Sequence, residues 1–194
     1  DKEIHLNANK ITPQISWGTS PEHTIGVDGI IPDPCQVVDK KKKTEMEIAL
    51  EYTNLKPGTP IEGVSINRVF LGSCTNSRIE DLIEASLLIK GRKVCPNVEA
   101  WVVPGSRNVK YEAECIGLDK VFVNAGFQWR EPGCSMCVGS NGELMSKGMR
   151  CVSTSNRNFI GRQGEGSYTH LGSPLTAVAS AIEGVITDPR KLIS

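Results

Sequence analysis

The sequence predicts an α/β domain in which a mainly parallel sheet forms the middle of three layers. Two observations carry this prediction. Runs of branched and aromatic residues alternate with helical patterns, and polar motifs follow directly after the strand-like runs. Because sites in parallel sheets lie at the carboxyl ends of the strands, these polar motifs are expected to gather at one edge of the sheet.

The chain is expected to divide into a lead-in at residues 1–60 and an α/β domain at residues 61–194. Residues 1–34 are rich in Pro, Gly, Asn and Asp and lack periodicity, so they are predicted to be extended or looped, as the tail of a preceding domain. The chain begins at Asp1 with neither a methionine nor a signal peptide. We therefore expect a processed product or an excised fragment.

One helix is predicted inside the lead-in. The four lysines at 40–43 are predicted to form a solvent-exposed segment just before this helix, because an acidic helical pattern follows. Thr44 as N-cap and Glu47 at the third helical position form a capping-box pair. The helix is expected to end before Lys56-Pro57-Gly58.

In the second part, strand and helix patterns alternate. Strands are predicted at 64–71, 99–103 and 150–154, and helices from 76 or 77 to Gly91, at 108–116 and at 174–183. Segment 119–125 fits either a strand or a short helix capped by Asp119 and followed by Gly126. The buried face of the first of these helices is predicted to consist of Ile79, Leu82, Ile83, Ser86 and Leu87.

The composition narrows the classes of function. Hydrophobic residues make up 39% and charged residues 23% of the chain, as in soluble globular proteins. Lys+Arg and Asp+Glu are equal at 22 each, so net charge does not indicate a nucleic acid or an anionic membrane as a partner. No apolar run approaches the roughly 18 residues of a membrane span. Small-molecule chemistry or protein contacts are favoured.

Seven cysteines are scattered without the spacing of a disulfide framework, which favours a reducing compartment, here the cytoplasm. Cys134 and Cys137 form a C-x-x-C pair, whose two thiolates can reach one metal or one cluster. Cys74 stands at the mouth of a predicted helix, where the dipole favours a thiolate. Structural thiols are predicted at the other four positions, Cys35, Cys95, Cys115 and Cys151.

Ligand chemistry leaves alternatives for the three singled-out cysteines. A zinc finger is disfavoured because no histidine has finger spacing, and a thioredoxin-like pair is disfavoured because Pro132-Gly133 predicts a loop before the pair. Three cysteines could hold a cluster in which one iron has no protein ligand and acts as a Lewis acid. From the residues alone, this open cluster and buried structural thiols both remain possible.

A polar loop from Ser155 to Arg162 follows the last predicted strand. Its two arginines, Arg157 and Arg162, are suited to hold carboxylates through parallel charge-assisted hydrogen bonds. Ordinary surface ion pairs are the alternative, but the density of Asn and Gly in this loop favours binding. His170 is expected to pack or to form hydrogen bonds rather than to catalyse.

The motifs at 71–81, 132–137 and 155–162 together resemble the aconitase superfamily. The stretches at 13–19 and 126–130 are similar to its isopropylmalate dehydratase branch, and the resemblance covers essentially the whole chain. It implies a fold like the third domain of aconitase. It also implies a 4Fe-4S cluster with one iron lacking a protein ligand. The implied site residues are Cys74, Cys134 and Cys137 as cluster ligands, Arg157 and Arg162 as catalytic, carboxylate-binding residues, and Asn156 as a substrate-binding residue beside the cluster.

The resemblance also implies a reaction, a dehydration followed by rehydration that interconverts 2- and 3-isopropylmalate in leucine biosynthesis. The implied partners are the alkylmalate substrate, a small subunit with a swivelling domain, and the remaining domains of the large subunit. Because those parts carry the catalytic base, this chain alone is expected to be an incomplete enzyme. The alternatives are homoaconitase or another aconitase-family isomerase, and a cluster-free structural or assembly fragment.

Overall fold

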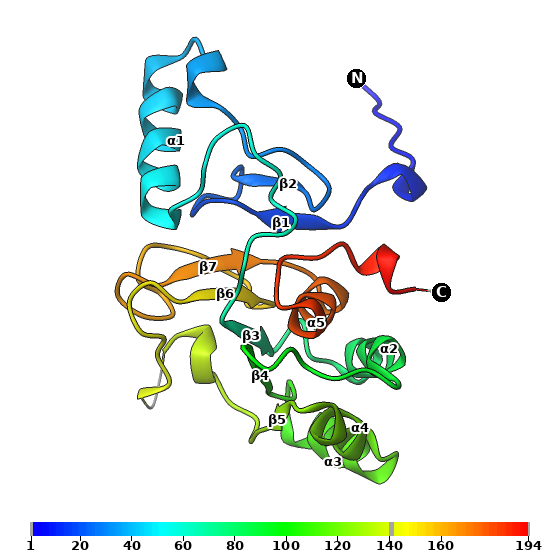
Figure 1. Cartoon of the computed structure of the whole chain (residues 1–194). Helices are drawn as coiled ribbons and strands as arrows, with labels where there is room; N and C mark the ends of the chain where they lie inside the picture. Colours follow the sequence, from blue (N-terminus) through cyan, green and yellow to red (C-terminus); the bar gives the residue numbers. More distant parts are fainter. Residues whose placement is uncertain (1, 140–141, 194) are drawn as a thin grey trace.

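The computed structural model describes residues 2–139 and 142–193, and its centre is a five-stranded parallel sheet (Figure 1). The strand order is β5–β4–β3–β6–β7. The chain therefore runs outward from β3 to β5 and then returns to place β6 on the other side of β3. A crevice for ligands opens at such a switch point. The strands are β3 (Arg68–Leu71), β4 (Glu99–Val102), β5 (Gln128–Trp129), β6 (Arg150–Ser153) and β7 (Tyr168–Leu171).

The two faces of the sheet are covered differently, because successive side chains of a strand point to opposite sides. Val69 and Val102 belong to the larger core, whereas Phe70 and Trp101 belong to a second, smaller core. The short η3 (Ser135–Cys137) packs into the smaller core. On the side of the larger core lie four helices: α2 (Ile79–Ile89), α3 (Arg107–Cys115), α4 (Leu118–Ala125) and α5 (Pro174–Glu183) (Figure 1). The predicted three-layer α/β fold is confirmed.

The lead-in is more ordered than its composition predicted. β1 pairs antiparallel with β2, and Ile15 of β1 forms a bridge with Gly172, just after β7. Ile15 and Trp17 are buried in the larger core, so this segment is part of the wall beside β7. Whether a domain boundary falls at residue 60 stays a prediction. The elements are η1 (Ala8–Lys10), β1 (Gln14–Ser16), β2 (Thr24–Gly26), η2 (Pro34–Gln36) and α1 (Lys40–Thr53).

The predicted start of α1 was wrong. The helix begins at Lys40, and Asp39 Oδ1 accepts from the backbone N–H groups of Lys41 at 2.8 Å and Lys42 at 3.1 Å. Asp is as good an N-cap as Thr, and lysines are good helix formers, so the lysine run forms the first turn. Thr44 instead lies inside the helix, where its hydroxyl donates to the Lys40 carbonyl.

Other elements differ from prediction in extent or in the face they bury. The first predicted strand is shortened, because Ser65 forms a separate antiparallel bridge with Val185. In α2, Ile83 and Leu87 are exposed, and the buried residues are Leu82, Ala85, Ser86, Leu88 and Ile89. Segment 118–125 is a helix, and β5 and β7 were not predicted. α5 begins at Pro174 and ends before Gly184 as predicted.

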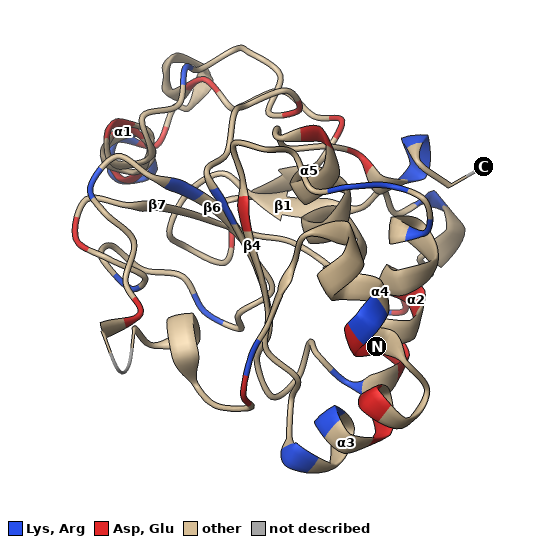
Figure 2. Cartoon of the chain, turned by 60° about the horizontal axis from the view of Figure 1, so that its bottom comes forward, with Lys and Arg blue, Asp and Glu red and all other residues tan. Residues whose placement is uncertain are grey.

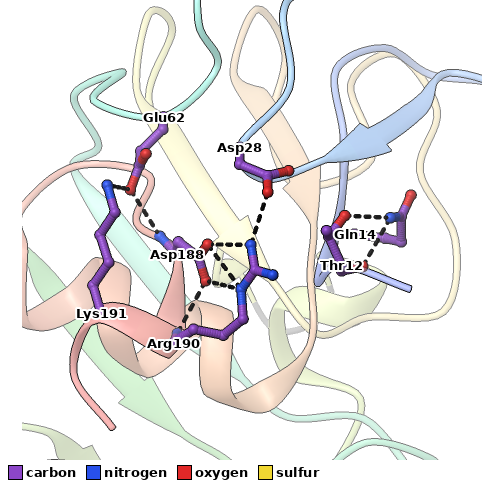
Figure 3. Close-up of polar contacts among 7 residues, drawn as sticks. All are labelled: Thr12, Gln14, Asp28, Glu62, Asp188, Arg190 and Lys191. Atoms are coloured by element: carbon purple, nitrogen blue, oxygen red, sulfur yellow. Dashed lines mark hydrogen bonds and ion pairs between the residues drawn. The ribbon is translucent and has the colours of Figure 1, made fainter. Parts of the chain in front are cut away.

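Polar contacts join the C-terminal turn η5 (Pro189–Lys191) to Asp28 of the lead-in and to Glu62, just after the lead-in (Figure 3). The Nη2 atom of Arg190 lies 2.8 Å from Asp28 Oδ2 and 2.6 Å from Asp188 Oδ2, and Lys191 reaches Glu62 at 2.7 Å. Elsewhere acidic and basic residues are interspersed along the chain (Figure 2). Within the described ranges no helix has the length and apolar character needed to cross a membrane.

Candidate functional site

A cavity of about 750 Å³ lies where β3, β6 and β7 reach their carboxyl ends. Its lining comes from four parts of the chain: the loop after β3, the arginine loop (residues 155–162) after β6, the end of β7, and the β1–β2 segment of the lead-in. The contributing residues are Thr75 and Asn76, Ser155 to Phe159, Leu171 and Gly172, and from the lead-in Gln14, Ser16, Gly18 to Pro21 and Thr24. The cavity therefore occupies the switch-point crevice that the strand order creates.

The loops after β3 and β6 are joined by hydrogen bonds at the mouth of this crevice. Thr154 Oγ1 accepts from the Gly72 N–H at 2.8 Å and lies 2.7 Å from the Gly72 carbonyl. Asn76 Nδ2 donates to the Thr154 carbonyl at 2.7 Å and to Asn156 Oδ1 at 3.2 Å. The Thr75 hydroxyl also donates to Asn156 Oδ1. These bonds fix the Asn156 side chain against the loop that carries Cys74.

Cys74 is exposed and lies in the loop after β3. The helix predicted to begin beside it starts only at Ile79, and the dipole effect falls off within the first turn. Cys74 therefore lies in the loop before the helix, and not at the helix N-terminus as the sequence predicted. Ser73, immediately before it, has φ of 91°, an uncommon conformation for a residue with a side chain.

The C-x-x-C pair lies on the face of the sheet opposite to the helices, in and beside η3. Cys134 is exposed and Cys137 is half-buried, and the Cys137 N–H closes the turn by donating to the Cys134 carbonyl at 2.8 Å. Met136, between them, has no exposed surface. The turn is thus anchored by its central side chain, with Cys134 exposed and Cys137 packed at the edge of the smaller core.

The three thiols fit an iron–sulfur cluster by donor chemistry, because all are accessible and thiolates are its usual ligands. They are not gathered: in residues 2–139 and 142–193 no three His, Cys, Asp or Glu side chains are grouped as a metal ion requires.

The two predicted arginines face different parts of the site. Arg157 is exposed and lines the cavity. Arg162 is half-buried, and its Nη2 atom lies 3.8 Å from the Cys137 sulfur. Its guanidinium carbon lies 5.1 Å from the centroid of the Phe159 ring, and its Nε is buried without a partner in the described structure. The arginine loop therefore connects the cavity to the paired thiols.

Sequence reasoning missed the residues that hold this loop. Tyr52 of α1 accepts from the Gly161 N–H at 3.0 Å, and its hydroxyl donates to the Ser167 carbonyl. Asn158 Nδ2 donates to the carbonyls of Gly18 at 3.1 Å and Thr169 at 2.7 Å. Residues 13–19 stood out only by resemblance, and nothing in the local pattern near Tyr52 indicates such a contact.

The remaining titratable groups divide into buried and exposed ones. His170 is buried, as predicted for a histidine that packs and forms hydrogen bonds. Burial raises the pKa of the Cys151 thiol to about 12, consistent with a structural thiol, and Cys95 is half-buried. Cys35 and Cys115 are exposed at η2 and at the end of α3, so the prediction of packed thiols was wrong for these two.

Comparison with known proteins agrees with this arrangement. The chain matches the model of the aconitase family (aconitate hydratase) over residues 1–184, and it belongs to that family. It is 56% identical over 192 residues to the 3-isopropylmalate dehydratase large subunit 1 of Bradyrhizobium diazoefficiens. The match covers 99% of this chain, which spans about 40% of the length of that curated relative. The resemblance found in the motifs is confirmed.

Proposed function

We propose that the chain is the thiol-bearing part of a 3-isopropylmalate dehydratase, a hydro-lyase that interconverts 2- and 3-isopropylmalate in leucine biosynthesis. One observation carries the proposal. The exposed thiol of Cys74 and the arginine loop, whose Arg162 reaches Cys137, follow the two strands at the switch point of a parallel sheet, in a chain 56% identical to a large subunit of that name. The cavity of about 750 Å³ is within the range of small-molecule sites.

The proposed ligand set rests on the family resemblance of the motifs that carry these cysteines and on thiol donor chemistry. Cys74, Cys134 and Cys137 would hold a 4Fe-4S cluster in which one iron has no protein ligand. When bound, such a cluster supplies a Lewis acid for the loss and return of a hydroxyl group. The guanidinium of Arg162 lies beside this ligand set, because its Nη2 atom is 3.8 Å from the Cys137 sulfur.

The cavity-lining side chains would orient the substrate. Arg157 offers a guanidinium to a carboxylate of an alkylmalate, and its planar fork fixes the orientation of the acid. Asn156, held by Thr75 and Asn76, offers a rigid amide at the same wall. Gln14 and Thr24 bring further hydrogen-bonding groups from the lead-in, which would help to bind and orient a hydroxy acid.

The partners follow from what the cavity lacks. No Asp, Glu or His is among the described residues that line it, so a carboxylate or imidazole base would have to come from elsewhere. The remaining domains of the large subunit and a small subunit with a swivelling domain would supply it. We place the reaction in the cytoplasm, because all seven cysteines are free thiols and a reducing compartment keeps them so.

The test is the iron and acid-labile sulfide content of the chain after anaerobic reconstitution, in the parent and in Cys74→Ser and Cys137→Ser. Cys115→Ser is the matched control, because that thiol is also exposed but lies on α3. We expect cluster-level iron in the parent and the control, and loss of iron in the other two variants. Iron that is retained without Cys74 or without Cys137 would contradict the ligand set.

A parent without iron points in one of two directions, which the same measurement on a complete large subunit separates. Iron there would mean that the fragment needs its missing domains to close the site. Absence of iron there as well would favour a cluster-free structural or assembly role. Turnover of 2-isopropylmalate against homocitrate by the complete enzyme then distinguishes the dehydratase from homoaconitase.

A further inference from the structure

Met136 lies between the two cysteines of the C-x-x-C turn and is more deeply buried than either of them. Its side chain is buried, whereas Cys134 is exposed and Cys137 is half-buried. Burial of a methionine side chain stabilises a fold, so this contact anchors the turn. The side chain lies in the smaller core, whose other buried members are Phe70, Trp101, Val103, Met145 and Cys151.

The anchor supports a backbone that is unfavourable by itself. Ser135, beside Met136, has φ of 43°, in the left-handed region. A residue with a side chain is disfavoured there. The burial of Met136 offsets this cost, and without it the turn would be free to relax.

The guanidinium of Arg68 contacts the sulfur of Met136. Arg68 Nη1 donates to Met136 Sδ at 3.7 Å, a weak hydrogen bond. The Arg68 guanidinium lies 4.4 Å from the Trp101 ring centroid and pairs with Glu99, which also accepts from Trp101 Nε1 at 2.9 Å. Arg68 opens β3, and Cys74 lies in the loop that follows this strand, so β3 connects the support of the turn to the third thiol.

We propose that Met136 is a positioning residue, which holds η3 so that Cys134 and Cys137 present their sulfur atoms together to one soft ligand. The iron–sulfur cluster is that ligand if the proposed function holds, and to this extent the inference rests on it. The positioning itself is a property of the turn and is measurable without iron. Changes to residues that orient metal ligands typically reduce metal affinity about 10- to 100-fold.

The probe is phenylarsine oxide, which binds two neighbouring thiols at once. Two As–S bonds form, the oxide oxygen leaves as water with both thiol protons, and arsenic stays trivalent. Affinity is measured on the whole chain by intact mass spectrometry, and peptide mapping identifies adducts that link Cys134 to Cys137. The variants are Met136→Ala, the conservative Met136→Leu and the control Met145→Ala, which shortens another buried methionine of the same core.

We expect Met136→Ala to weaken arsenical binding at this pair about tenfold, and Met136→Leu and Met145→Ala to bind like the parent. Parent-like binding by Met136→Ala, or equal weakening by Met145→Ala, would overturn the inference. Urea unfolding confirms that each variant is folded, and Met136→Val replaces Met136→Ala if that variant does not fold. The two proposals can fail separately. If Met136→Ala weakens arsenical binding as expected but the complete large subunit takes up no iron, the proposed function is overturned and the positioning role of Met136 stands.

Discussion

Nη1 of Arg150 lies 2.6 Å from Nε2 of His170 in the interior of the protein. Because an arginine can only donate, Nε2 accepts and the imidazole proton is on Nδ1, which donates to the Ser16 carbonyl at 2.7 Å. Nη2 of Arg150 donates to the Thr53 carbonyl at 2.8 Å, at the end of α1. One buried cation and one neutral imidazole therefore attach β1 and α1 to β6 and β7, and Ser16 carries this attachment to the cavity wall.

This arrangement predicts acid sensitivity. Burial, with a further contribution from Arg150, lowers the pKa of His170 from 6.5 to about 3. Below pH 6.5 the unfolded chain binds a proton that the folded chain does not bind. The free energy of unfolding is expected to fall by about 1.4 kcal/mol for each pH unit below 6.5. Urea unfolding between about pH 7.5 and pH 5 measures this slope.

His170→Gln is expected to be less stable at neutral pH and to lose most of the slope, because its amide is neutral throughout. His23 retains a smaller contribution of the same sign, since burial lowers its pKa as well. His5→Gln is the control, because that side chain is 84% exposed. A slope unchanged in His170→Gln would show that His170 is not the group that titrates.

A second prediction concerns the arginine loop. Tyr52→Phe removes the hydroxyl that bonds Gly161 and Ser167, and leaves these backbone groups without that partner. Loss of a buried partner costs roughly 1–3 kcal/mol, and here the loss falls on the loop. Trypsin is expected to cut faster after Arg157 and Arg162 in this variant, as followed by mass spectrometry of the early fragments.

The control for that experiment is Tyr111→Phe, since Tyr111 is 71% exposed on α3 and far from the loop in sequence. Its cleavage pattern should match the parent. Equal cleavage rates in the parent and in Tyr52→Phe would mean that α1 does not restrain the loop.

The sequence predicted those elements whose signal is local. Two apolar runs, Val69 to Leu71 and Trp101 to Val103, are terminated by Gly72 and Pro104. This local pattern alone predicts strands, without knowledge of their tertiary contacts. Tyr168–Leu171 contains Thr and His and is a strand because it pairs with β6. The buried face of α2 was ambiguous, because its sequence offers two apolar stripes and packing against α4 and α5 selects one.

The same division holds at the site. Cysteines and arginines stand out by residue type, so Cys74 and Arg157 could be chosen from the sequence alone. Tyr52 could not be chosen, because its partner Ser167 is 115 residues away and the contact leaves no trace in the local pattern. The assignment of cluster ligands and carboxylate-binding arginines stays a prediction, which iron content and substrate binding will decide.

Gly164, two residues after the arginine loop, packs closely against the segment that carries Met145. Gly164 has φ of 140°, and a Cβ added there would lie 2.2 Å from the Met145 carbonyl oxygen. Gly164→Ala would have to separate these two backbones, which the Met145 N–H also joins through the Gln163 carbonyl at 2.7 Å. Backbone strain and overpacking together are expected to cost about 3 kcal/mol of the free energy of unfolding.

Gly58→Ala is the matched control, because Gly58 also has positive φ, at 73°, but an added Cβ would meet no described atom within 4 Å. Strain alone is expected there, and it costs about 1 kcal/mol. Urea unfolding of the two variants separates the effects, since both carry the penalty of a left-handed alanine and only Gly164→Ala adds the clash. Equal losses would show that the loop moves away from Met145 at little cost, and that the smaller core tolerates a shift of this segment.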